Sequence, residues 1–549
     1  MKSLEIPLGK RTKQYRFFEI LPGLLSYGAI ILLIVLSFLN TVLASAYLLL
    51  IVLTALVRAV GIAYHTIKGN KELKRACAVN WHARLMELGD AEASYKRLKD
   101  KNYKEYEFSN HKENLLAIAS NPKKYPKPDE IINAVIITAY TEPFDVIEPT
   151  IKALTKVTYD KKNLLIFFAY EERGGEAIEA TVKKLKSLYG DQFMDFVLSK
   201  HPKDLPNEVV GKGGNITYAG HRLKEYCDRN KIAYDKVIVT TLDCDNRPHP
   251  KYFDAVAYEY IVNENRNNMS YQPVSLFINN IWDVPAPMRV LATGNSFWNI
   301  ISSVRPHTLR NFASHSQPLK ALVGMNFWSV RTIVEDGHQY WRSYFYFKGN
   351  YTVQPILVPI YQDAVLSGTL KKTLKDQFKQ LRRWSYGASD IAYVAMNIFT
   401  KDRDVPLMPA LGRFIRLLDG HVTLACISFL VAFGGWVPLI VNPRASMLIA
   451  AQQLPDAISK IQQVAMLGII VTIVISFQII PKRPARYKWT KSIFMFTQWI
   501  LMPVTAILYS ALAAYVAQTR LMFGKYLDKF DLTEKITVDS LDKLKAKKK

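Results

Sequence analysis

The stretch IINAVIITAY, residues Ile131–Tyr140, decides the class of fold that this sequence predicts. It is a short, almost continuous apolar run rich in β-branched residues, as expected of a strand buried on both faces. Similar runs follow at Leu164–Tyr170, Phe193–Ser199 and Val237–Leu242, and helical patterns such as Ala177–Tyr189 lie between them. Strand and helix alternating at this spacing predict an α/β domain with a mostly parallel sheet and flanking helices.

Acidic residues follow these predicted strands where each one ends. Glu142 comes shortly after the first strand, Glu171 and Glu172 after the second, and Asp243 and Asp245 after the fourth. The carboxyl ends of parallel strands meet at one edge of a sheet, which is where open α/β sheets bind their ligands. We therefore expect these carboxylates to lie together at a binding site.

A glycine-rich segment, Gly211–Asn215 (GKGGN), lies between the third and fourth strands and opens a helix predicted to run to about Arg229. Lys212 and the N-terminus of that helix offer positive potential to an anionic donor molecule. Gly213 and Gly214 would let the backbone approach the donor closely. By itself the motif is also typical of a flexible turn.

Two pairs of carboxylates stand out along the chain. Asp243 and Asp245, offset by two residues on an extended segment, can share one hard cation, Mg²⁺ or Mn²⁺, that bridges the oxygens of a nucleotide diphosphate. Glu335 and Asp336 form the second pair. The alternative for each pair is a solvated turn, because Asp, Asn and Pro favour turns.

A basic helix is predicted over Thr373–Ala392. Gln380, Arg383 and Trp384 fall at i, i+3 and i+4 and therefore share one face of it. An amide, a guanidinium and an indole suit a sugar, because the indole stacks on an apolar ring face while the polar groups bind hydroxyls and charge. The alternative is a helix that lies on the membrane surface, since lysines surround these residues.

Several uncharged apolar stretches are long enough to cross a bilayer, which takes about 20 residues in a helix. The first, Ile20–Val57, has no Asp, Glu, Lys or Arg, and Asn40-Thr41 near its middle predicts a hairpin of two helices. A cleaved signal peptide is the alternative, although this run is longer than the usual core of about 7–15 residues. Three further stretches follow at His421–Val441, Ile461–Pro481 and Ser492–Gln518.

Lys and Arg near the ends of these stretches predict the orientation. They precede the first helix, follow the second and follow the fourth, so the N-terminus and residues 65–418 are expected on the cytosolic side of the plasma (inner) membrane. Five crossings would place the C-terminus, which ends Lys547-Lys548-Lys549, outside. Two alternatives remain: either Ser492–Gln518, with Pro503 in its middle, does not fully cross, or the tail departs from the charge rule.

The overall composition excludes some classes of protein. The net charge of +25 comes with no basic–aromatic nucleic-acid module, and much of it flanks membrane segments, so membrane lipids rather than nucleic acid are the expected partner. The four cysteines lie far apart without metal-ligand spacing, which indicates a reducing compartment and no zinc site. The predicted organisation is an N-terminal transmembrane hairpin (1–64), a helical connector (65–130), a catalytic domain (131–400), an amphipathic interface segment (401–420), C-terminal transmembrane helices (421–518) and a basic tail (519–549).

The order of these motifs resembles that of membrane-bound family 2 glycosyltransferases of the cellulose-synthase, chitin-synthase and hyaluronan-synthase kind. The shared elements are an acidic strand end, a D-x-D, a T-E-D-type acid and a Q-x-x-R-W, here Glu171/Glu172, Asp243-Cys244-Asp245, Glu335-Asp336 and Gln380…Arg383-Trp384. The resemblance covers residues 130–400 by motif and the flanks by topology. It implies a GT-A-like fold for the soluble domain and an all-α transmembrane region.

The resemblance also implies a role for each motif residue. Asp336 would be the catalytic base, Asp245 with Asp243 would hold the metal, and Trp384 and Glu335 would meet the acceptor. The implied donor-binding residues are Glu171, Glu172, Asp243, Gln380 and Arg383, to which the strand-end and glycine-rich patterns add Glu142 and Lys212. The implied reaction is inverting transfer of a sugar from a UDP-sugar or related donor to a polysaccharide or glycolipid acceptor, with Mg²⁺ or Mn²⁺ as cofactor.

The sequence departs from the family pattern at two places, and several alternatives stay open. Val334 stands where the family has Thr, and Glu171 or Glu172 stands where it has Asp. Gln272-Pro273 and Asn279-Asn280 either line an acceptor path or form an ordinary strand and turn. A hydrolase leaves the GKGGN segment unexplained, and a transporter or scaffold is disfavoured because the spanning segments contain almost no ionisable residues.

Overall fold

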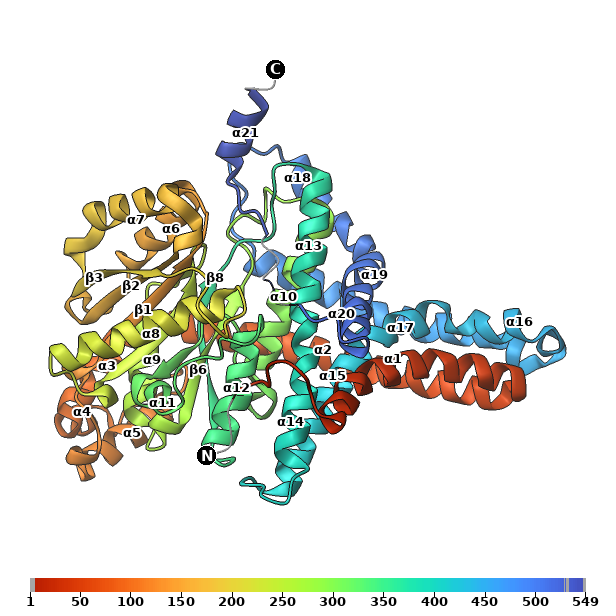
Figure 1. The fold of residues 1–549 in the computed structure, drawn as a ribbon, viewed down its shortest axis with the longest axis horizontal. Helices are drawn as coiled ribbons and strands as arrows, with labels where there is room; N and C mark the ends of the chain where they lie inside the picture. The colour runs from red at the N-terminus through yellow and green to blue at the C-terminus, as the bar shows by residue number, and fades with distance from the viewer. Residues whose placement is uncertain (1–4, 528, 530–532, 547–549) are drawn as a thin grey trace.

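The computed structural model describes residues 5–527, 529 and 533–546, which form an α/β domain and a set of long helices beside it (Figure 1). Lys2 and the last three lysines of the predicted basic tail lie outside the described residues. The predicted α/β class, a mostly parallel sheet with flanking helices beside an all-α region of apolar helices, is confirmed.

The α/β domain contains one eight-stranded sheet with the order β3-β2-β1-β4-β7-β6-β8-β5. Its strands are β1 (Ile132–Ala139), β2 (Leu164–Glu171), β3 (Asp195–His201), β4 (Val237–Asp243), β5 (Arg247–Pro248), β6 (Met269–Leu276), β7 (Ser316–Pro318) and β8 (Thr352–Tyr361). The four strands predicted from the sequence, β1 to β4, are parallel neighbours. The short β7 runs antiparallel between β4 and β6, and β5 is antiparallel to β8.

Both faces of the parallel half of the sheet are covered by helices, as near-continuous apolar strands require. Val135 of β1 belongs to a buried cluster that includes Ile147 of α6 (Phe144–Leu154), on the same face as α7 (Gly175–Tyr189) and α9 (Tyr252–Val262). The next residue towards the N-terminus, Ala134, faces the opposite cluster with Ile216 of α8 (Lys212–Arg229). Because β1, β2 and β4 are parallel, their carboxyl ends meet at one edge between the two helical layers.

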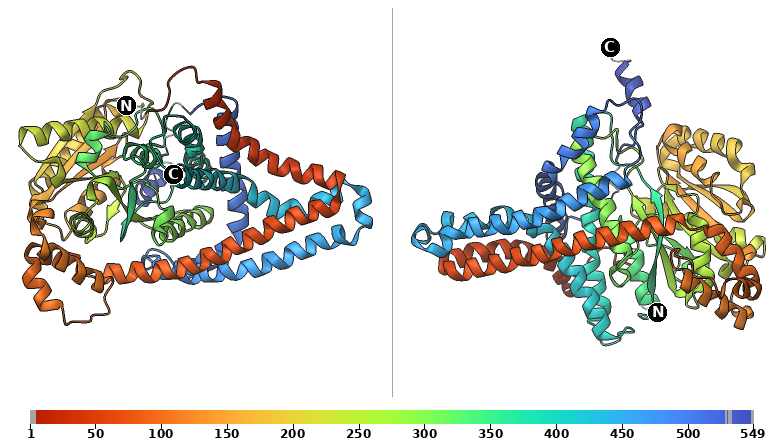
Figure 2. Two further views of the ribbon diagram at one scale, coloured as in Figure 1. Left: turned by 90° about the horizontal axis from the view of Figure 1, so that it is seen from below. Right: turned by 180° about the vertical axis from the view of Figure 1, so that it is seen from behind.

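Within the part of the chain that the structure describes, five helical segments are long and apolar enough to cross a membrane. They are α1 (Lys13–Leu39), α2 (Thr41–Ala78), α15 continuing through α16 (Leu407–Val441), α17 (Ile449–Ile479) and α18 through α20 (Thr490–Met522). The turn predicted at Asn40 is confirmed: its side-chain oxygen accepts from the amides of Val42 (3.0 Å) and Leu43 (3.2 Å) and so caps α2. Figures 1 and 2 show α1, α2, α16 and α17 projecting together from the α/β domain.

The fifth segment lies across the base of these projecting helices, and both of its ends contact the domain side of the molecule (Figures 1 and 2). Just before it, Arg486 pairs with Asp283 at 2.6 Å. At its far end the Arg16 guanidinium donates to the carbonyl of Leu521 at 2.9 Å. Three short helical pieces, α18 (Thr490–Thr497), α19 (Met502–Thr505) and α20 (Leu512–Met522), are joined by 3₁₀ and π turns around Pro503.

The remaining helices connect these parts. They are α3 (Trp81–Glu87), α4 (Ala91–Leu98), α5 (Phe108–Ser120), α10 (Ala286–Ser303), α11 (Leu319–Gly324), α12 (Glu335–Tyr346), α13 (Leu370–Ser385), α14 (Asp390–Ile398) and α21 (Val538–Ala546). The segment predicted as a helical connector (65–130) contains several helices, because Asn80 and Asp90 accept backbone amide hydrogens and start new ones. The helix expected over Thr373–Ala392 begins earlier, at Leu370, where the Thr369 side chain caps it.

Candidate active site

Lys212 and Asp243 meet at the carboxyl end of the parallel strands. Asp243 is the last residue of β4 and Lys212 is the first residue of α8, and the Lys212 Nζ lies 2.7 Å from an Asp243 carboxylate oxygen. Burial alone would raise the pKa of Asp243, but the Lys212 ammonium, with Lys535 and Arg383, lowers it to about 2. Asp243 is therefore ionised and lies at the N-terminus of α8.

Asp245 lies beside it and carries a second cation. The Lys535 ammonium is 2.8 Å from an Asp245 carboxylate oxygen, and the Asn279 amide donates to the Asp245 carbonyl at 3.2 Å. Asp363 is close enough that burial and the Asp245 charge raise its pKa to about 6, against the opposing charge of Arg247. Two lysines, Lys212 and Lys535, therefore lie among the three carboxylates of Asp243, Asp245 and Asp363.

The second acid pair forms the first turn of α12 and faces the same lysine. Glu335 is buried, and burial together with the Asp336 charge raises its pKa to about 8, while Lys212 opposes this rise. Asp336 is half-buried, and one of its carboxylate oxygens accepts from the Gly337 amide at 2.7 Å. Glu335 is therefore mostly protonated at neutral pH beside a more accessible carboxylate.

Helix α13 contributes Arg383 to this cluster. Its charge acts to lower the pKa of both Asp243 and Glu335, so the guanidinium lies close to both acid pairs. The Gln380 amide oxygen accepts from Gln377 of the same helix at 3.1 Å. Trp384 is 39 % exposed, and its ring lies 5.8 Å from that of Phe277, the residue that follows β6.

The acids that follow β1 and β2 lie at the same edge of the sheet but have protein partners. Glu142 accepts from the Tyr140 amide at 2.7 Å, and its charge acts on Lys535. Both oxygens of the buried Glu171 are engaged, one with His201 (3.2 Å) and one with Arg173 (3.1 Å).

Glu172 accepts from the Lys203 amide at 3.0 Å, so it and Glu171 both hold the loop that follows β3. His201 also contacts Glu208 at 3.1 Å; burial would lower the pKa of His201, but Glu171 and Glu208 raise it to about 9. Among the residues that the structure describes, neither Glu171 nor Glu172 forms a hydrogen bond or ion pair with Asp243 or Asp336.

Packing requires glycine at position 213 of the GKGGN segment. A Cβ on Gly213 would lie 2.5 Å from the Ser329 carbonyl oxygen, and one on Gly214 would lie 2.6 Å from a Glu208 carboxylate oxygen. The expectation that they serve a close approach to the donor is therefore joined by a second reason, the close approach of α8 to the protein's own chain. That packing places Lys212 opposite Glu335 and Asp336.

Sequence reasoning missed several residues at this site. Lys535 lies in the tail, 290 positions from Asp245, and no local pattern distinguishes it from its neighbouring lysines. Asp363 follows β8, a strand that the sequence pattern did not predict because two prolines interrupt it. His315 donates to the Phe312 carbonyl (2.8 Å) and accepts from the Trp328 indole (3.3 Å), and burial lowers its pKa to about 4. A strand-end search that included β7 and β8 would have found Asp363 and His315.

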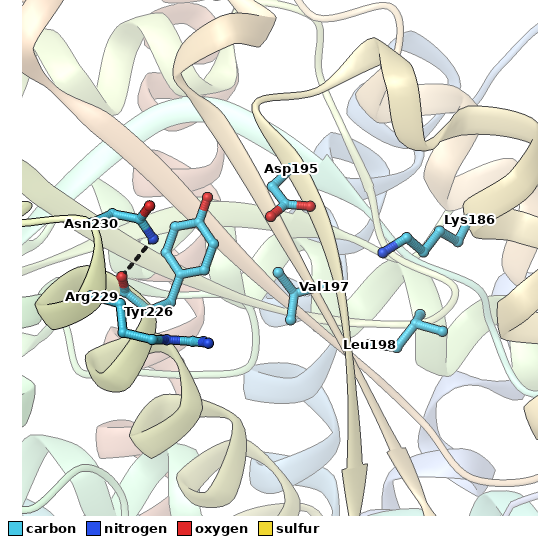
Figure 3. A pocket seen from close by; sticks show the side chains of 7 residues that line it. All are labelled: Lys186, Asp195, Val197, Leu198, Tyr226, Arg229 and Asn230. Atoms are coloured by element: carbon cyan, nitrogen blue, oxygen red, sulfur yellow. Dashed lines mark hydrogen bonds between the residues drawn. The ribbon is translucent and has the colours of Figure 1, made fainter.

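A surface hollow of about 570 Å³ lies elsewhere, at the edge strand of the sheet (Figure 3). Asp195 and Val197 of β3 line it together with Tyr226 and Arg229 of α8. Asp195 is the first residue of β3, so the hollow is at the opposite end of the strands from Asp243. It contains none of the residues of the acid cluster.

The D-x-D segment fits a divalent cation that shares its coordination with a substrate. Among the described residues no group of three or more His, Cys, Asp or Glu side chains could hold a metal by itself. Mg²⁺ is commonly bound by one or two carboxylates plus phosphate oxygens and water. The Lys535 ammonium lies against Asp245, so the surroundings of this carboxylate accommodate a positive charge.

Comparisons with known proteins give only weak similarities. A family model for EhaA, a subunit of the NiFe-hydrogenase-type-3 Eha complex, matches residues 447–534, a range that holds none of the predicted site residues. No curated protein matches the chain. Among solved structures, the mannosyltransferase PcManGT from Pyrobaculum calidifontis, in complex with GDP-Man and Mn²⁺, is 14 % identical with a TM-score of 0.40, covering 85 % of this chain and 100 % of that one.

A second similar structure is S. aureus TarS 1-349 in complex with UDP-GlcNAc. It is 11 % identical with a TM-score of 0.34, covering 74 % of this chain and 95 % of that one. The same protein in complex with UDP is 9 % identical, with a TM-score of 0.33. At these values the similarities establish neither a family nor an activity for this chain.

Proposed function

We propose that this protein is a membrane-bound, inverting glycosyltransferase that transfers a sugar from a nucleotide-diphosphate donor to a saccharide or lipid-linked acceptor. The observation that carries the proposal is the meeting of Lys212, Asp243, Glu335 and Arg383 at one edge of an α/β sheet, with Asp336 beside them. Positive groups for a diphosphate and an available carboxylate for a hydroxyl proton are the two requirements of such a transfer.

In the proposed reaction Asp336 takes the proton of an acceptor hydroxyl as that oxygen attacks the anomeric carbon. The bond from this carbon to the diphosphate oxygen breaks at the same time, and its electron pair leaves with the diphosphate. Lys212 and Arg383 stabilise that negative charge from fixed positions. A Mg²⁺ or Mn²⁺ ion held by Asp245 and Asp243 would neutralise the leaving diphosphate further.

The other predicted residues supply binding on either side of this centre. Gln380 is proposed to contact the diphosphate from α13, and Glu142, Glu171 and Glu172 to form the nucleotide side of the site. Glu171 and Glu172 would act through the loop after β3 that they hold. Trp384, supported by Phe277, is proposed to stack on the acceptor sugar, with the neutral Glu335 carboxyl able to donate a hydrogen bond.

The proposed topology has four crossings, with the catalytic domain and the C-terminal residues on the cytosolic side. Both ends of the segment Thr490–Met522 contact the domain side, which supports the alternative that this segment does not fully cross. Exposed Trp489, Phe496 and Ile500 along it suit a position at the membrane interface. This arrangement keeps the basic tail inside, in agreement with the charge rule.

The direct test is a donor screen. The purified full chain in detergent is incubated with a panel of nucleotide sugars and Mg²⁺ or Mn²⁺, and nucleotide release is followed. Release with one donor that depends on the cation and on Asp336 supports the proposal. No release with any donor, metal or added acceptor would favour a transporter or scaffold.

A further inference from the structure

The N-terminal segment, defined here as residues 5–12, connects the α/β domain to α1. The Glu5 carboxylate pairs with the Arg342 guanidinium of α12 at 3.0 Å and accepts a hydrogen bond from the Ser329 hydroxyl at 2.7 Å. Figure 1 shows the segment between α12 and the start of α1. Glu5 therefore belongs to the surroundings of the helix that carries Asp336, although it precedes the first apolar helix.

Ile6 fixes the same end of the segment through apolar contacts. It is 5 % exposed and belongs to a buried cluster with Ile333 and Val334, the two residues that precede α12. The Ile6 carbonyl accepts from the Arg331 guanidinium at 3.1 Å. Side-chain and backbone contacts thus keep Glu5 beside α12.

Arg342 depends on Glu5 for its counter-charge. The Arg342 side chain is 1 % exposed, and it also donates to the Met325 carbonyl at 2.9 Å. Among the residues that the structure describes, no second carboxylate pairs with Arg342, and nothing accepts from its Nε and Nη1 atoms. Burial lowers the pKa of Arg342, and the Glu5 charge opposes this change. Because a guanidinium stays protonated in proteins, removal of the Glu5 charge would leave a buried charge unpaired, which is strongly unfavourable.

The ion pair acts on α12, the helix that carries the proposed base. Arg342 follows Glu335 by seven positions, so the two side chains lie on one face of α12, about 10 Å apart along its axis. Burial raises the pKa of Glu335 and the charge of Lys212 on α8 opposes this rise, so these two groups are neighbours. A shift of α12 that exposes Arg342 to water would therefore also displace Glu335 and Asp336 from Lys212.

Ser329 links Glu5 to the other side of the site, α8. The chain here lies against this helix, because Thr217 donates to the Trp328 carbonyl at 3.0 Å and a Cβ on Gly213 would lie 2.5 Å from the Ser329 carbonyl oxygen. The two oxygens of the Glu5 carboxylate thus engage α12 and the chain that packs on α8.

We propose that Glu5 is a positioning residue that holds the Asp336-bearing helix α12 against the Lys212-bearing helix α8. It acts through Arg342 and Ser329 and touches neither donor nor acceptor. This role rests on the proposed function, since Asp336 and Lys212 are the proposed base and the proposed diphosphate contact.

The kinetic test compares Glu5→Gln with the wild type in the full chain in detergent, at a temperature where both are folded. Gln keeps the length of the side chain and can accept from Ser329, but it leaves Arg342 without a counter-charge. We expect kcat for transfer to fall by about 10–100-fold, the effect of misplacement by roughly 1 Å, with UDP–Mn²⁺ affinity within a few-fold. Glu92→Gln, at an exposed acid of α4, is the matched control and should leave both unchanged. An unchanged kcat in Glu5→Gln would overturn the positioning role.

The ion pair itself is tested without turnover, by thermal unfolding of a double-mutant cycle. Glu5→Gln should lower the midpoint by several degrees in the wild type but hardly at all in Arg342→Met, where no buried charge is left unpaired. Equal lowering in both backgrounds would overturn the dependence of Arg342 on Glu5.

Hydrogen exchange separates positioning from a general loss of stability. In Glu5→Gln the amides of residues 327–339 should exchange faster than in the wild type, while those of β1 stay unchanged. A uniform increase over the whole α/β domain, or no increase at residues 327–339, would overturn the positioning role.

The same measurements separate this role from the proposed function. If the wild type releases no nucleotide from any donor, the proposed function fails, but the midpoint cycle and the hydrogen exchange still decide whether Glu5 holds α12. If the wild type transfers sugar and Glu5→Gln does so equally well, the proposed function stands and the positioning role fails.

Discussion

Asp336 and Glu335 are adjacent in sequence, yet their carboxyl groups have different surroundings. Glu335 is 4 % exposed and its raised pKa keeps it protonated, whereas Asp336 is more accessible and accepts a hydrogen bond from Gly337. Neighbouring acids whose environments separate their protonation states are typical of sites that move protons. Asp336 is therefore the proposed base.

Asp336→Asn should reduce transfer by about 10²–10⁴-fold while donor affinity stays within a few-fold of the wild type. The amide is nearly isosteric but cannot accept the acceptor's proton. Nucleotide release and donor affinity are measured on one preparation, with Glu335→Gln as the matched control because Gln resembles a protonated Glu. Near-normal turnover in a folded Asp336→Asn protein would remove Asp336 from the mechanism.

Glu335 also predicts a pH dependence of stability. Its pKa is raised from 4.5 to about 8 in the folded protein, so the unfolded chain releases this proton at lower pH than the folded one. The stability that Glu335 contributes is complete below pH 4.5 and is lost as pH rises to about 8. The thermal midpoint of Glu335→Gln in detergent should therefore rise relative to wild type across this window. A pH-independent difference between the two proteins would contradict the raised pKa.

At the scale of the element, α13 carries two of the proposed site residues, Arg383 and Trp384. Thr369 caps its first turn and accepts from the Lys372 amide at 3.2 Å, which sets where the helix begins and hence which residues face the site. Arg383 then lies near the acids, while Trp384 lies against Phe277. One helical face therefore joins the donor side to the proposed acceptor side.

Trp384→Ala should weaken acceptor binding by on the order of 1 kcal/mol, the value of a lost aromatic contact, with Mn²⁺ affinity intact. The acceptor concentration dependence of transfer measures this. Trp489→Ala, at an exposed tryptophan before α18, is the control and should leave acceptor use unchanged. A loss of Mn²⁺ binding in Trp384→Ala would show a general disturbance of the site instead.

Helix α8 depends on a close approach that only glycine permits. Gly213→Ala adds a Cβ only 2.5 Å from the Ser329 carbonyl oxygen, and overpacking of this kind costs about 1–3 kcal/mol. Gly294→Ala in α10 is the matched control, because no atom lies within 4 Å of its added Cβ and alanine favours a helix by up to about 1 kcal/mol. Thermal unfolding should lower the midpoint for Gly213→Ala and raise or preserve it for Gly294→Ala. Equal midpoints would contradict the packing role of Gly213.

At the scale of the whole molecule, the α/β domain and residues 533–546 lie on one side of the membrane in the proposed topology. Lys535 contacts Asp245, and Arg16 at the start of α1 donates to the end of α20. These contacts join the start of α1 to the end of α20, and Lys535 to the α/β domain. The loop between α16 and α17 lies at the far end of the projecting helices (Figure 2).

Cysteine labelling from outside intact cells tests this topology. In a Cys77→Ser background, Ser187→Cys and Asp539→Cys should stay unlabelled by an impermeant reagent, because both positions are expected in the cytosol. Arg444→Cys, in the loop between α16 and α17, should label rapidly and serves as the positive control. Rapid labelling at Ser187→Cys would overturn the orientation, and labelling only at Asp539→Cys would restore the fifth crossing.

The sequence by itself determined the local elements of this protein. Buried strands such as Ile132–Ala139, the capping turn at Asn40 and the acids at the end of β4 all follow from patterns within about ten residues. Such patterns act through backbone propensity and burial, which neighbouring residues set. The strand β8 was not predicted because prolines interrupt its apolar run, and β6 was offered only as an alternative for Gln272-Pro273.

Only the tertiary structure decided which of these residues meet. The placement of β7 between β4 and β6, the pairing of Glu171 with His201 and the contact of Lys535 with Asp245 join residues far apart in the chain. These contacts arise from the packing of whole elements and from charges that burial brings together, and no local sequence pattern encodes either. The acids of the D-x-D motif could therefore be predicted from the sequence, whereas the contact of Lys535 with Asp245 could be found only from the fold.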